Sequence, residues 1–253
     1  MKKLIVFDLD GTLAESKSAM SLDMAELLEE LLKHFHVAII SGGAYPQFEL
    51  QFLNSLPLPD ELLQKLFLFP TCATSFYQYQ DKIWKQMYSE DLSQPEKDKI
   101  LAAFAKCFET VGFVVPRRPE HGEIIEDRKT QITFSALGQQ APGSLKKKWD
   151  PYHLKRLEMI DILRQHIPEF EIRTGGSTSI DVTKKDIDKA YGIRQIEKYL
   201  KFKPEEIIFI GDALFDGGND SPVKYTGVNC IETSGPTDTM RIIKEIIHKH
   251  AQK

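Results

Sequence analysis

Cysteine is scarce in this chain, since only Cys72, Cys107 and Cys230 occur among 253 residues. They are widely spaced and form no Cys-x-x-Cys pair, so the pattern indicates neither a zinc site nor a disulfide framework. The seven histidines also show no metal-ligand spacing and are interpreted as solvated side chains. The pattern favours the reducing cytosol.

Long apolar runs are missing as well. None approaches the roughly 18 residues that a membrane helix needs, and Asp8 and Asp10 interrupt the apolar start before a signal-peptide core can form. The formal net charge is only −4, which gives no electrostatic footprint for nucleic acid or an anionic membrane. We therefore expect an untargeted cytoplasmic protein whose partner is a small soluble molecule, with no nucleic acid and no membrane.

Short apolar runs are present and predict the strands of a parallel sheet. Residues 4–7, 37–40, 66–69 and 207–210 are apolar runs that end in glycine, proline or polar residues. Such runs suit strands that are covered on both faces. Residues 21–33 have leucines at helical spacing, so the order is strand, helix, strand. This predicts an α/β fold with a doubly wound, Rossmann-like parallel sheet.

The chain changes character near residue 84. Charged helical stretches and short alternating strands follow, at residues 95–108, 123–127, 131–134, 151–166 and 177–182. A helix at 190–200, strands at 207–210 and 228–231 and a helix at 237–251 then complete the first pattern. We expect a core of residues 1–83 and 186–253 that carries an inserted α+β domain of residues 84–185.

Two carboxylates follow the first predicted strand, in the run Asp8-Leu9-Asp10-Gly11-Thr12. The strand period of two places both on one side where the strand ends, and ligands of open α/β sheets bind beyond the carboxyl ends of strands. Two close carboxylates resist joint ionisation without a cation, and Mg²⁺ with its oxygen ligands is suited to that place. The alternative is an Asx turn that closes the strand.

Three further segments carry candidate groups. Asp212 ends the strand at 207–210 and supplies another oxygen ligand, and glycines in the following loop let backbone approach an anion. Ser41 and Gly42 end the second strand and offer a hydroxyl and amides to a phosphate. Lys189 precedes a helix, where its ammonium can bind phosphate. Each alone is also typical of a turn or a surface residue.

Taken in this order over nearly the whole chain, these segments resemble the haloacid-dehalogenase superfamily. The insert is similar to the α/β cap of the branch that contains sugar-phosphate phosphatases and eukaryotic-type phosphomannomutases, and such a cap selects the substrate. The resemblance implies that Asp8 is the nucleophile, Asp10 the general acid and base and Lys189 a catalytic lysine. It also implies Mg²⁺ as cofactor, held by Asp8, Asp10 and Asp212. The implied substrate or phosphate contacts are Ser41, Gly42, Asn219 and Asp220 in the core and Arg128, Ser179 and Asp181 in the cap.

The choice between mutase and phosphatase rests on residues 211–220 and on the cap. Residues 211–220 have the long spacing and Gly-Gly-Asn-Asp ending of the mutases, and residues 126–128 and 175–182 resemble mutase segments that hold the sugar and its distal phosphate. Two further cap arginines of the mutases are replaced here by Gln139 and, by ungapped count, by Lys146. We expect a phosphomannomutase-like enzyme that interconverts mannose 6-phosphate and mannose 1-phosphate, with a hexose 1,6-bisphosphate activator. A sugar-phosphate phosphatase is the alternative, and a non-catalytic metabolite-binding protein is a more distant one.

Two other features have local interpretations. Residues 146–148 are three lysines, for which we favour a charged cap loop over contact with an anionic ligand. Aromatic residues gather between residues 76 and 88, and their two interpretations are core packing and a homodimer interface formed through the cap.

Overall fold

The computed structural model describes residues 2–16 and 18–252, and the chain divides into two compact units. The larger unit comprises Met1–Ser89 and Asp188–Lys253, and the smaller unit is Glu90–Ile187. The first boundary follows Ser89, whereas the sequence predicted it before Trp84. The reason is that Ile83–Ser89 form a strand that pairs within the sheet of the larger unit.

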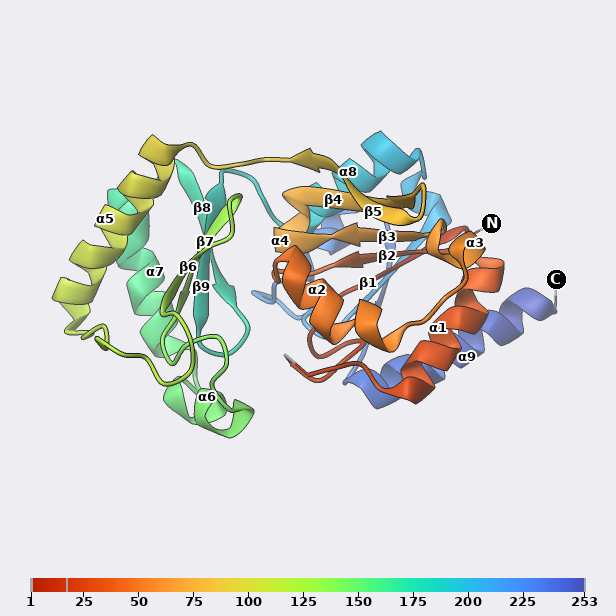
Figure 1. The fold of residues 1–253 in the computed structure, drawn as a ribbon, viewed down its shortest axis with the longest axis horizontal. Helices are drawn as coiled ribbons and strands as arrows, with labels where there is room; N and C mark the ends of the chain where they lie inside the picture. Colours follow the sequence, from red (N-terminus) through yellow and green to blue (C-terminus); the bar gives the residue numbers. More distant parts are fainter. Residues whose placement is uncertain (1, 17, 253) are drawn as a thin grey trace. The chain divides into compact units, whose positions relative to one another are not determined.

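The larger unit contains a seven-stranded sheet in the order β11-β10-β1-β2-β3-β4-β5. The strands β11, β10, β1, β2 and β3 are parallel, and β4 and β5 extend the sheet as antiparallel strands (Figure 1). This confirms the predicted α/β fold with a parallel-sheet core. The strands are β1 (Leu4–Phe7), β2 (His36–Ile40), β3 (Leu66–Phe69), β4 (Ser75–Gln80), β5 (Ile83–Ser89), β10 (Ile207–Gly211) and β11 (Asn229–Glu232).

Helices cover both faces of this sheet. They are α1 (Leu22–His34), α2 (Tyr45–Gln51), α3 (Asp60–Leu63), α4 (Pro70–Ala73), α8 (Lys189–Leu200) and α9 (Pro236–Ala251), with short 3₁₀ helices η1 (Leu53–Ser55), η2 (Pro204–Glu206) and η3 (Ser221–Thr226). Ser21 caps α1 by accepting a hydrogen bond from the Met24 amide at 3.3 Å.

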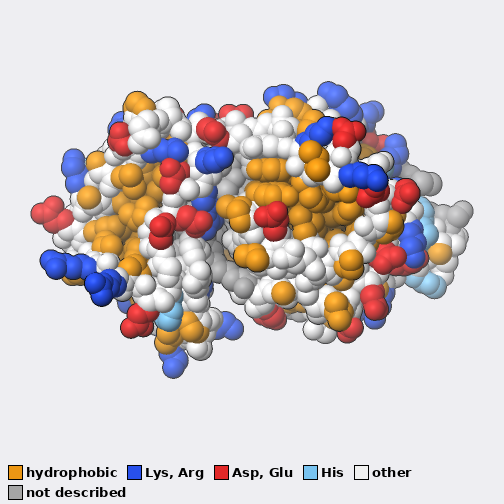
Figure 2. Space-filling model, viewed as in Figure 1, with side chains coloured by type: hydrophobic (Ala, Val, Ile, Leu, Met, Phe, Trp, Pro, Cys, Tyr) orange, Lys and Arg blue, Asp and Glu red, His pale blue; other side chains and the backbone are white. Residues whose placement is uncertain are grey.

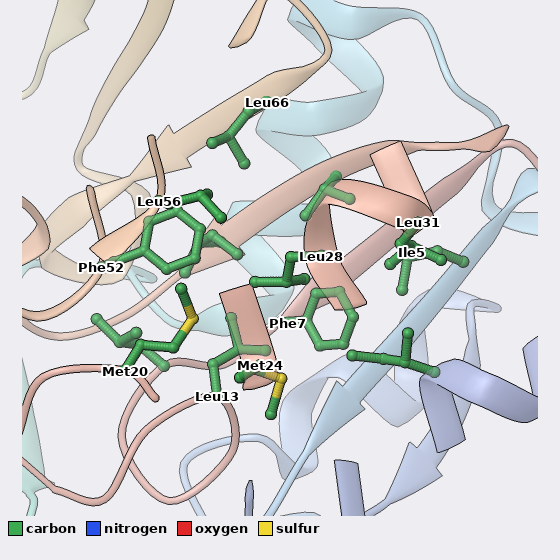
Figure 3. Packing of buried hydrophobic residues seen from close by; sticks show 14 of the residues in the cluster. Ile5, Phe7, Leu13, Met20, Met24, Leu28, Leu31, Phe52, Leu56 and Leu66 are labelled. Atoms are coloured by element: carbon green, nitrogen blue, oxygen red, sulfur yellow. The ribbon is translucent and has the colours of Figure 1, made fainter. Parts of the chain in front are cut away.

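Alternate residues of β1 pack into two different hydrophobic clusters. Ile5 and Phe7 pack with α1 and α9 (Figure 3), whereas Leu4 and Val6 pack with α8 and β3. A strand whose side chains alternate between two covered faces is apolar at every position. Burial on both faces therefore explains why the run is continuously apolar until Asp8.

The smaller unit is an antiparallel sheet in the order β6-β7-β9-β8 with helices packed on it. Its apolar cluster includes Ile132 and Phe134 of β7 together with residues of α5 and α7. The alternate β7 residues Gln131, Thr133 and Ser135 are buried and polar, and the strand period directs them to the opposite face. The elements are α5 (Gln94–Val111), β6 (Ile125–Asp127), β7 (Gln131–Ser135), α6 (Gly143–Trp149), α7 (Leu154–His166), β8 (Phe170–Gly175) and β9 (Ser179–Lys184).

The prediction of a lysine loop at 146–148 was wrong, because these residues lie in α6 and the buried Lys146 ammonium donates to the Gln139 carbonyl at 2.8 Å. The strands β4 and β5, which carry the aromatic residues, form a hairpin. The Phe76 ring stacks on the Phe69 ring, with their centroids 4.6 Å apart. Core packing is therefore the role of Phe76.

Charged side chains of both signs are intermixed on the face drawn in Figure 2. Within residues 2–16 and 18–252, no helix combines the length and the apolar character that crossing a membrane requires.

Candidate active site

Asp8 lies where β1 ends, and its carboxyl group is almost fully buried at 4% exposure. The Asp8 amide donates to the Ile210 carbonyl at 3.0 Å, which continues the pairing of β1 with β10. Gly11 has φ +85°, and a Cβ there would lie 2.5 Å from Oδ2 of Asp212. The glycine after Asp10 is therefore required both for the turn and for the close approach of Asp212.

Lys189 begins α8 and directs its ammonium onto two carboxylates. Its Nζ atom lies 2.6 Å from Oδ1 of Asp8 and also forms an ion pair with Oδ1 of Asp220. Lys189 is 1% exposed and Asp220 is 0% exposed. The Asp188 side chain caps α8 by accepting from the Tyr191 amide at 2.7 Å, which holds the helix start in place.

Three carboxylates meet at the carboxyl ends of β1 and β10. Oxygen atoms of Asp8, Asp212 and Asp220 all lie within 4.8 Å of one another. Oxygens bound to one Mg²⁺ at about 2.1 Å lie at most about 4.2 Å apart, which is close to the spacing within this group. The donor set consists of hard oxygen ligands, and Asp212 is only partly buried, so these residues fit a divalent cation.

The charges in this group shift one another's pKa values. Burial raises the pKa of Asp8 well above its usual value, with Lys189 opposing the rise and Asp220 and Asp212 adding to it. Burial, and then the charge of Asp220, also raise the pKa of Asp212. Burial acts to lower the pKa of Lys189, but the charges of Asp220 and Asp8 outweigh it and the pKa is raised. The site therefore favours a cation over a bare set of three carboxylates.

The Asp10 side chain is not a member of this carboxylate group among the described residues. The sequence placed Asp10 with Asp8 and Asp212 as metal ligands and Asp220 among the substrate contacts, whereas the structure groups the Asp220 carboxylate with Asp8 and Asp212. Asp10 accepts hydrogen bonds from two glutamines of α2, Gln51 at 3.2 Å and Gln47 at 3.5 Å. The strand period that pairs Asp8 with Asp10 stops applying where β1 ends at Phe7.

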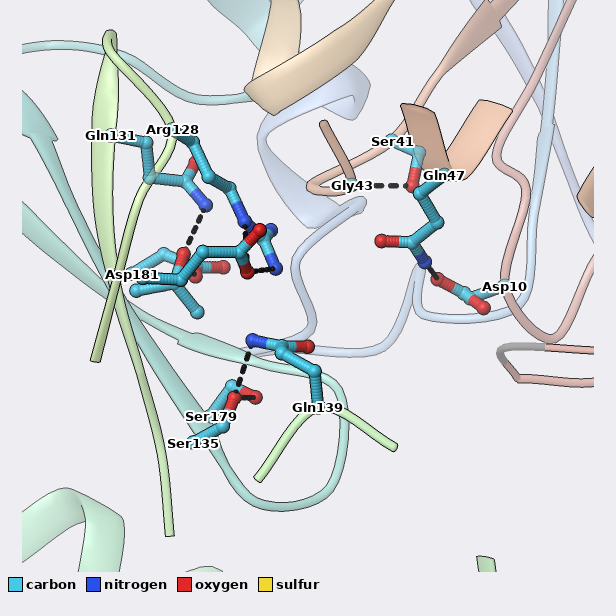
Figure 4. A network of polar contacts seen from close by, with 12 residues as sticks. Asp10, Ser41, Gly43, Gln47, Arg128, Gln131, Ser135, Gln139, Ser179 and Asp181 are labelled. Atoms are coloured by element: carbon cyan, nitrogen blue, oxygen red, sulfur yellow. Dashed lines mark hydrogen bonds and ion pairs between the residues drawn. The ribbon is translucent and has the colours of Figure 1, made fainter. Parts of the chain in front are cut away.

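The Ser41–Gly42–Gly43 loop follows β2. It is held by the Ser41 side chain and by backbone amides of the segment that follows β3. The buried Ser41 Oγ accepts from the Gly43 amide at 3.2 Å (Figure 4). The amides of Thr71 and Cys72 donate to the Gly43 and Ser41 carbonyls, each at 2.9 Å. Thr71 and Cys72 have φ of +50° and +55°, a left-handed conformation that is strained for such residues. The strain is therefore located beside the candidate phosphate loop.

Two of the predicted contacts in the smaller unit, Ser179 and Asp181, lie on one polar face of its sheet (Figure 4). The Ser135 and Ser179 hydroxyls are 2.8 Å apart, and Gln139 donates to Ser135 at 2.6 Å. Thr133 donates to Asp181 at 2.8 Å. This network connects Ser179 and Asp181 to neighbouring polar groups.

The remaining predicted contacts differ in their surroundings. Arg128 donates to one oxygen of Glu126 from Nε at 2.9 Å and from Nη2 at 2.7 Å. Asn219 is exposed, whereas the adjacent Asp220 is buried and accepts from the Ala213 amide at 3.0 Å. Gln47 and Gln51 were not among the predicted site residues; their spacing of four on a helix after Ser41 was the available signal.

Two solved structures illustrate the fold that this chain shares with known proteins. A haloacid dehalogenase-like hydrolase from Bacteroides thetaiotaomicron aligns with a TM-score of 0.64 and 18% identity, over 97% of this chain and 100% of that chain. Plasmodium falciparum IMP-nucleotidase aligns with a TM-score of 0.74 and 17% identity, over 98% of this chain and 68% of that chain. These alignments show that the chain shares the fold of both structures, the first of which is named as haloacid dehalogenase-like.

The family of this chain follows from the sequence comparisons. The family model of eukaryotic phosphomannomutase matches residues 24–249, and the chain belongs to this family. A phosphomannomutase of Encephalitozoon cuniculi is 27% identical over 98% of this chain and 94% of its own length. The Drosophila melanogaster phosphomannomutase is 27% identical over 96% of this chain and 95% of its own length. The predicted resemblance is confirmed.

Proposed function

We propose that this chain catalyses magnesium-dependent phosphoryl transfer on a hexose phosphate through a covalent intermediate on Asp8. The substrates proposed are mannose 6-phosphate and mannose 1-phosphate, in line with the names of the relatives. The observation that carries the proposal is the buried Asp8 carboxylate, which lies 2.6 Å from Lys189 and beside Asp212 and Asp220. A nucleophilic carboxylate that attacks a phosphate dianion needs positive charge around it.

In the first half-reaction, an Asp8 oxygen forms a bond to phosphorus while the bond to the sugar oxygen breaks. Asp10 gives its proton to that leaving oxygen. In the second half-reaction, Asp10 takes a proton from the acceptor hydroxyl as it attacks phosphorus and releases Asp8. The Ser41–Gly42 loop offers its hydroxyl and amides to the phosphoryl oxygens, and Lys189 holds Asp8 in position.

Asp8, Asp212 and Asp220 are the side chains that would hold Mg²⁺. When bound, the ion supplies positive charge that neutralises the phosphate and reduces repulsion with the nucleophile. We keep Asp10 in the acid and base role, because its carboxylate is bound by Gln51 and Gln47 rather than grouped with these three.

The two units have separate roles in this proposal. The larger unit provides the reacting groups and serves as the catalytic core. The smaller unit serves as the specificity cap, and Arg128, Ser179 and Asp181 bind the part of the sugar phosphate that does not react. Arginine can grip a phosphate with parallel hydrogen bonds, which suits Arg128 to the distal phosphate of a hexose bisphosphate.

A sugar-phosphate phosphatase is the second candidate, and one contact favours it. Lys146, which replaces a mutase arginine by ungapped count, is buried and donates to the Gln139 carbonyl at 2.8 Å. Gln139 replaces another arginine with a neutral amide. A cap with fewer cations would bind a distal phosphate weakly. Water, instead of a sugar hydroxyl, would then accept the phosphoryl group from Asp8.

The test is an assay of the parent and Asp8→Asn with mannose phosphates, Mg²⁺ and a hexose 1,6-bisphosphate, in which isomerised sugar and free phosphate are both measured. We expect isomerisation by the parent and a loss of at least about a thousandfold in Asp8→Asn, because an amide cannot be the nucleophile. Free phosphate without isomer would establish the phosphatase. A parent that turns over no phosphate ester would reject both candidates and favour a metabolite-binding protein.

A further inference from the structure

Two glutamines from one face of α2 hold the Asp10 carboxylate. Gln51 donates from Nε2 to Oδ1 of Asp10 at 3.2 Å. Gln47 donates from Nε2 to Oδ2 of Asp10 at 3.5 Å (Figure 4). The two glutamines are four residues apart, so both side chains lie on the same side of the helix. Each oxygen of the carboxylate therefore receives an amide donor.

Both polar atoms of the Gln51 side-chain amide form hydrogen bonds. Its Nε2 donates to Asp10 and also to the Ser18 carbonyl at 3.3 Å, while its Oε1 accepts from Gln47 at 2.5 Å. Two acceptors at the nitrogen and one donor at the oxygen permit only one orientation of the amide group. Gln51 is 3% exposed, so water does not compete for these contacts.

Gln47 connects Asp10 with the candidate phosphate loop. A Cβ built on Gly43 would lie 2.6 Å from Oε1 of Gln47, so the glutamine side chain packs directly against that loop. The Gln51 carbonyl accepts from the Met20 amide at 2.8 Å, which ties the end of α2 to the segment that follows the Asp10 turn. The position of Asp10 is thus coupled to the loop that carries Ser41.

We propose that Gln47 and Gln51 are positioning residues that fix the Asp10 carboxyl group for its two proton transfers. This inference rests on the proposed function. Asp10 must point at the leaving oxygen when its proton moves there as the phosphorus–oxygen bond breaks. It must then point at the acceptor hydroxyl when it takes a proton back. The amides orient Asp10 but cannot replace it, because a neutral amide is neither the acid nor the base in these steps.

Leaving-group chemistry separates this role from a general loss of structure. A nitrophenolate leaving group needs no proton, so formation of the Asp8 intermediate from 4-nitrophenyl phosphate is independent of how well Asp10 is oriented. Hydrolysis of that intermediate still requires Asp10 to take a proton from water. A misoriented Asp10 should therefore slow the second step more than the first.

The experiment uses the full chain with Mg²⁺ and the variants Gln51→Met and Gln47→Met, which keep side-chain length and remove the amide. Gln64→Met is the matched control, because Gln64 is exposed at the end of α3 in the same unit. Rapid mixing with 4-nitrophenyl phosphate measures the nitrophenolate burst, and steady-state assays with mannose 1-phosphate measure kcat and KM. Thermal unfolding of each variant is followed by circular dichroism.

For Gln51→Met we expect a burst approaching one nitrophenolate per active site and a steady state slowed by about tenfold or more. With mannose 1-phosphate we expect kcat to fall by about tenfold or more while KM changes by less than about threefold. Gln47→Met should show the same pattern to a smaller degree, since its hydrogen bond is longer, and Gln64→Met should equal the parent. If Gln51→Met does not fold, Gln47→Met decides the question.

Unchanged kinetics in folded variants, or equal slowing of burst and steady state, would overturn the positioning role while leaving the proposed function intact. A parent that transfers no phosphoryl group would overturn both.

Discussion

The Lys189 ammonium lies 2.6 Å from the Asp8 carboxylate, although 181 residues separate them in the chain. Both side chains are buried, and Asp220 shares the same ammonium. Buried charges are stable only when they are paired, so this lysine compensates two carboxylates at once. The relationship has consequences for stability as well as for catalysis.

Replacing this lysine should destabilise the larger unit. Lys189→Met leaves Asp8 and Asp220 buried without their shared cation, and loss of one partner of a buried ion pair costs about 3–5 kcal/mol. Chemical unfolding monitored by circular dichroism should show this difference from the parent. Mg²⁺ should raise the melting temperature of the variant, because the ion replaces the missing positive charge.

Lys198→Met is the control for that experiment, because Lys198 is exposed on the same helix. An unfolding midpoint of Lys189→Met equal to that of Lys198→Met would show that the carboxylates do not depend on the ammonium.

Arg128 should separate isomerisation from hydrolysis. Arg128→Ala removes a cation from the cap, and a charged hydrogen bond to phosphate contributes about 1.5–3 kcal/mol. We expect isomerisation of hexose phosphates to fall by about ten- to a hundredfold, with aryl phosphate hydrolysis largely unchanged. Arg118→Ala, an exposed arginine of the same unit, is the control.

Gln139→Arg is the informative gain-of-function variant for the same question. Suppose that the parent releases only free phosphate. Isomer formed by Gln139→Arg would then show that the parent lacks mutase activity because it binds the distal phosphate too weakly. Equal losses of isomerisation and aryl phosphate hydrolysis in Arg128→Ala would instead assign Arg128 a structural role.

Asp181 should contribute to binding of the sugar more than to binding of the phosphoryl group. Its carboxylate accepts from Thr133 at 2.8 Å on the polar face of the β6-β7-β9-β8 sheet. In Asp181→Ala we expect KM for mannose 1-phosphate to rise by about tenfold or more, since a charged acceptor for a sugar hydroxyl is lost. KM for an aryl phosphate should stay within about threefold. Asp161→Ala, at an exposed position on α7, is the control, and equal effects on both substrates would contradict a sugar-binding role.

The buried Asp150–Arg156 pair predicts how the smaller unit responds to acid. Arg156 Nε donates to Asp150 at 2.9 Å, and Arg156 Nη1 donates to the Gly176 carbonyl at 2.6 Å. Burial acts to raise the pKa of Asp150, but hydrogen bonds from Arg156 and two backbone amides outweigh it and hold the pKa below the ordinary 3.8. The stabilisation is therefore complete above about pH 4 and is lost as the pH falls through the lowered folded-state pKa.

Asp150→Asn tests this expectation by urea unfolding at pH 7 and at pH 3. Only two tryptophans are present, so Trp84→Phe makes Trp149, which packs against the apolar cluster of the smaller unit, the single reporter. The variant should be less stable than the parent at pH 7 by about 3 kcal/mol, and the difference should shrink at pH 3. A difference that does not depend on pH would show that the Asp150 charge is not the cause.

Local sequence patterns were sufficient to predict the fold and much of the site. The continuously apolar run Leu4–Phe7 predicted a buried parallel strand, and it is one because both faces of the sheet are covered. Asp8, Ser41 and Asp212 were predicted from their places immediately after such strands, and each lies at a strand end in the structure. These features depend on neighbours in sequence, so the sequence alone determined them.

Other features were decided only by tertiary structure. The strands β4, β5 and β8 contain polar residues mixed with aromatic ones. Whether such a segment forms a strand depends on the strands with which it pairs. The meeting of Lys189 with Asp220, and the contact of Gln51 with Asp10, join segments far apart in the chain. Such contacts depend on strand order and on side-chain direction at the helix and strand ends, neither of which a local pattern contains. For that reason the sequence alone indicated Asp8 and Asp10 as candidates for the nucleophile and the acid, whereas the tertiary structure decided which groups contact each of them.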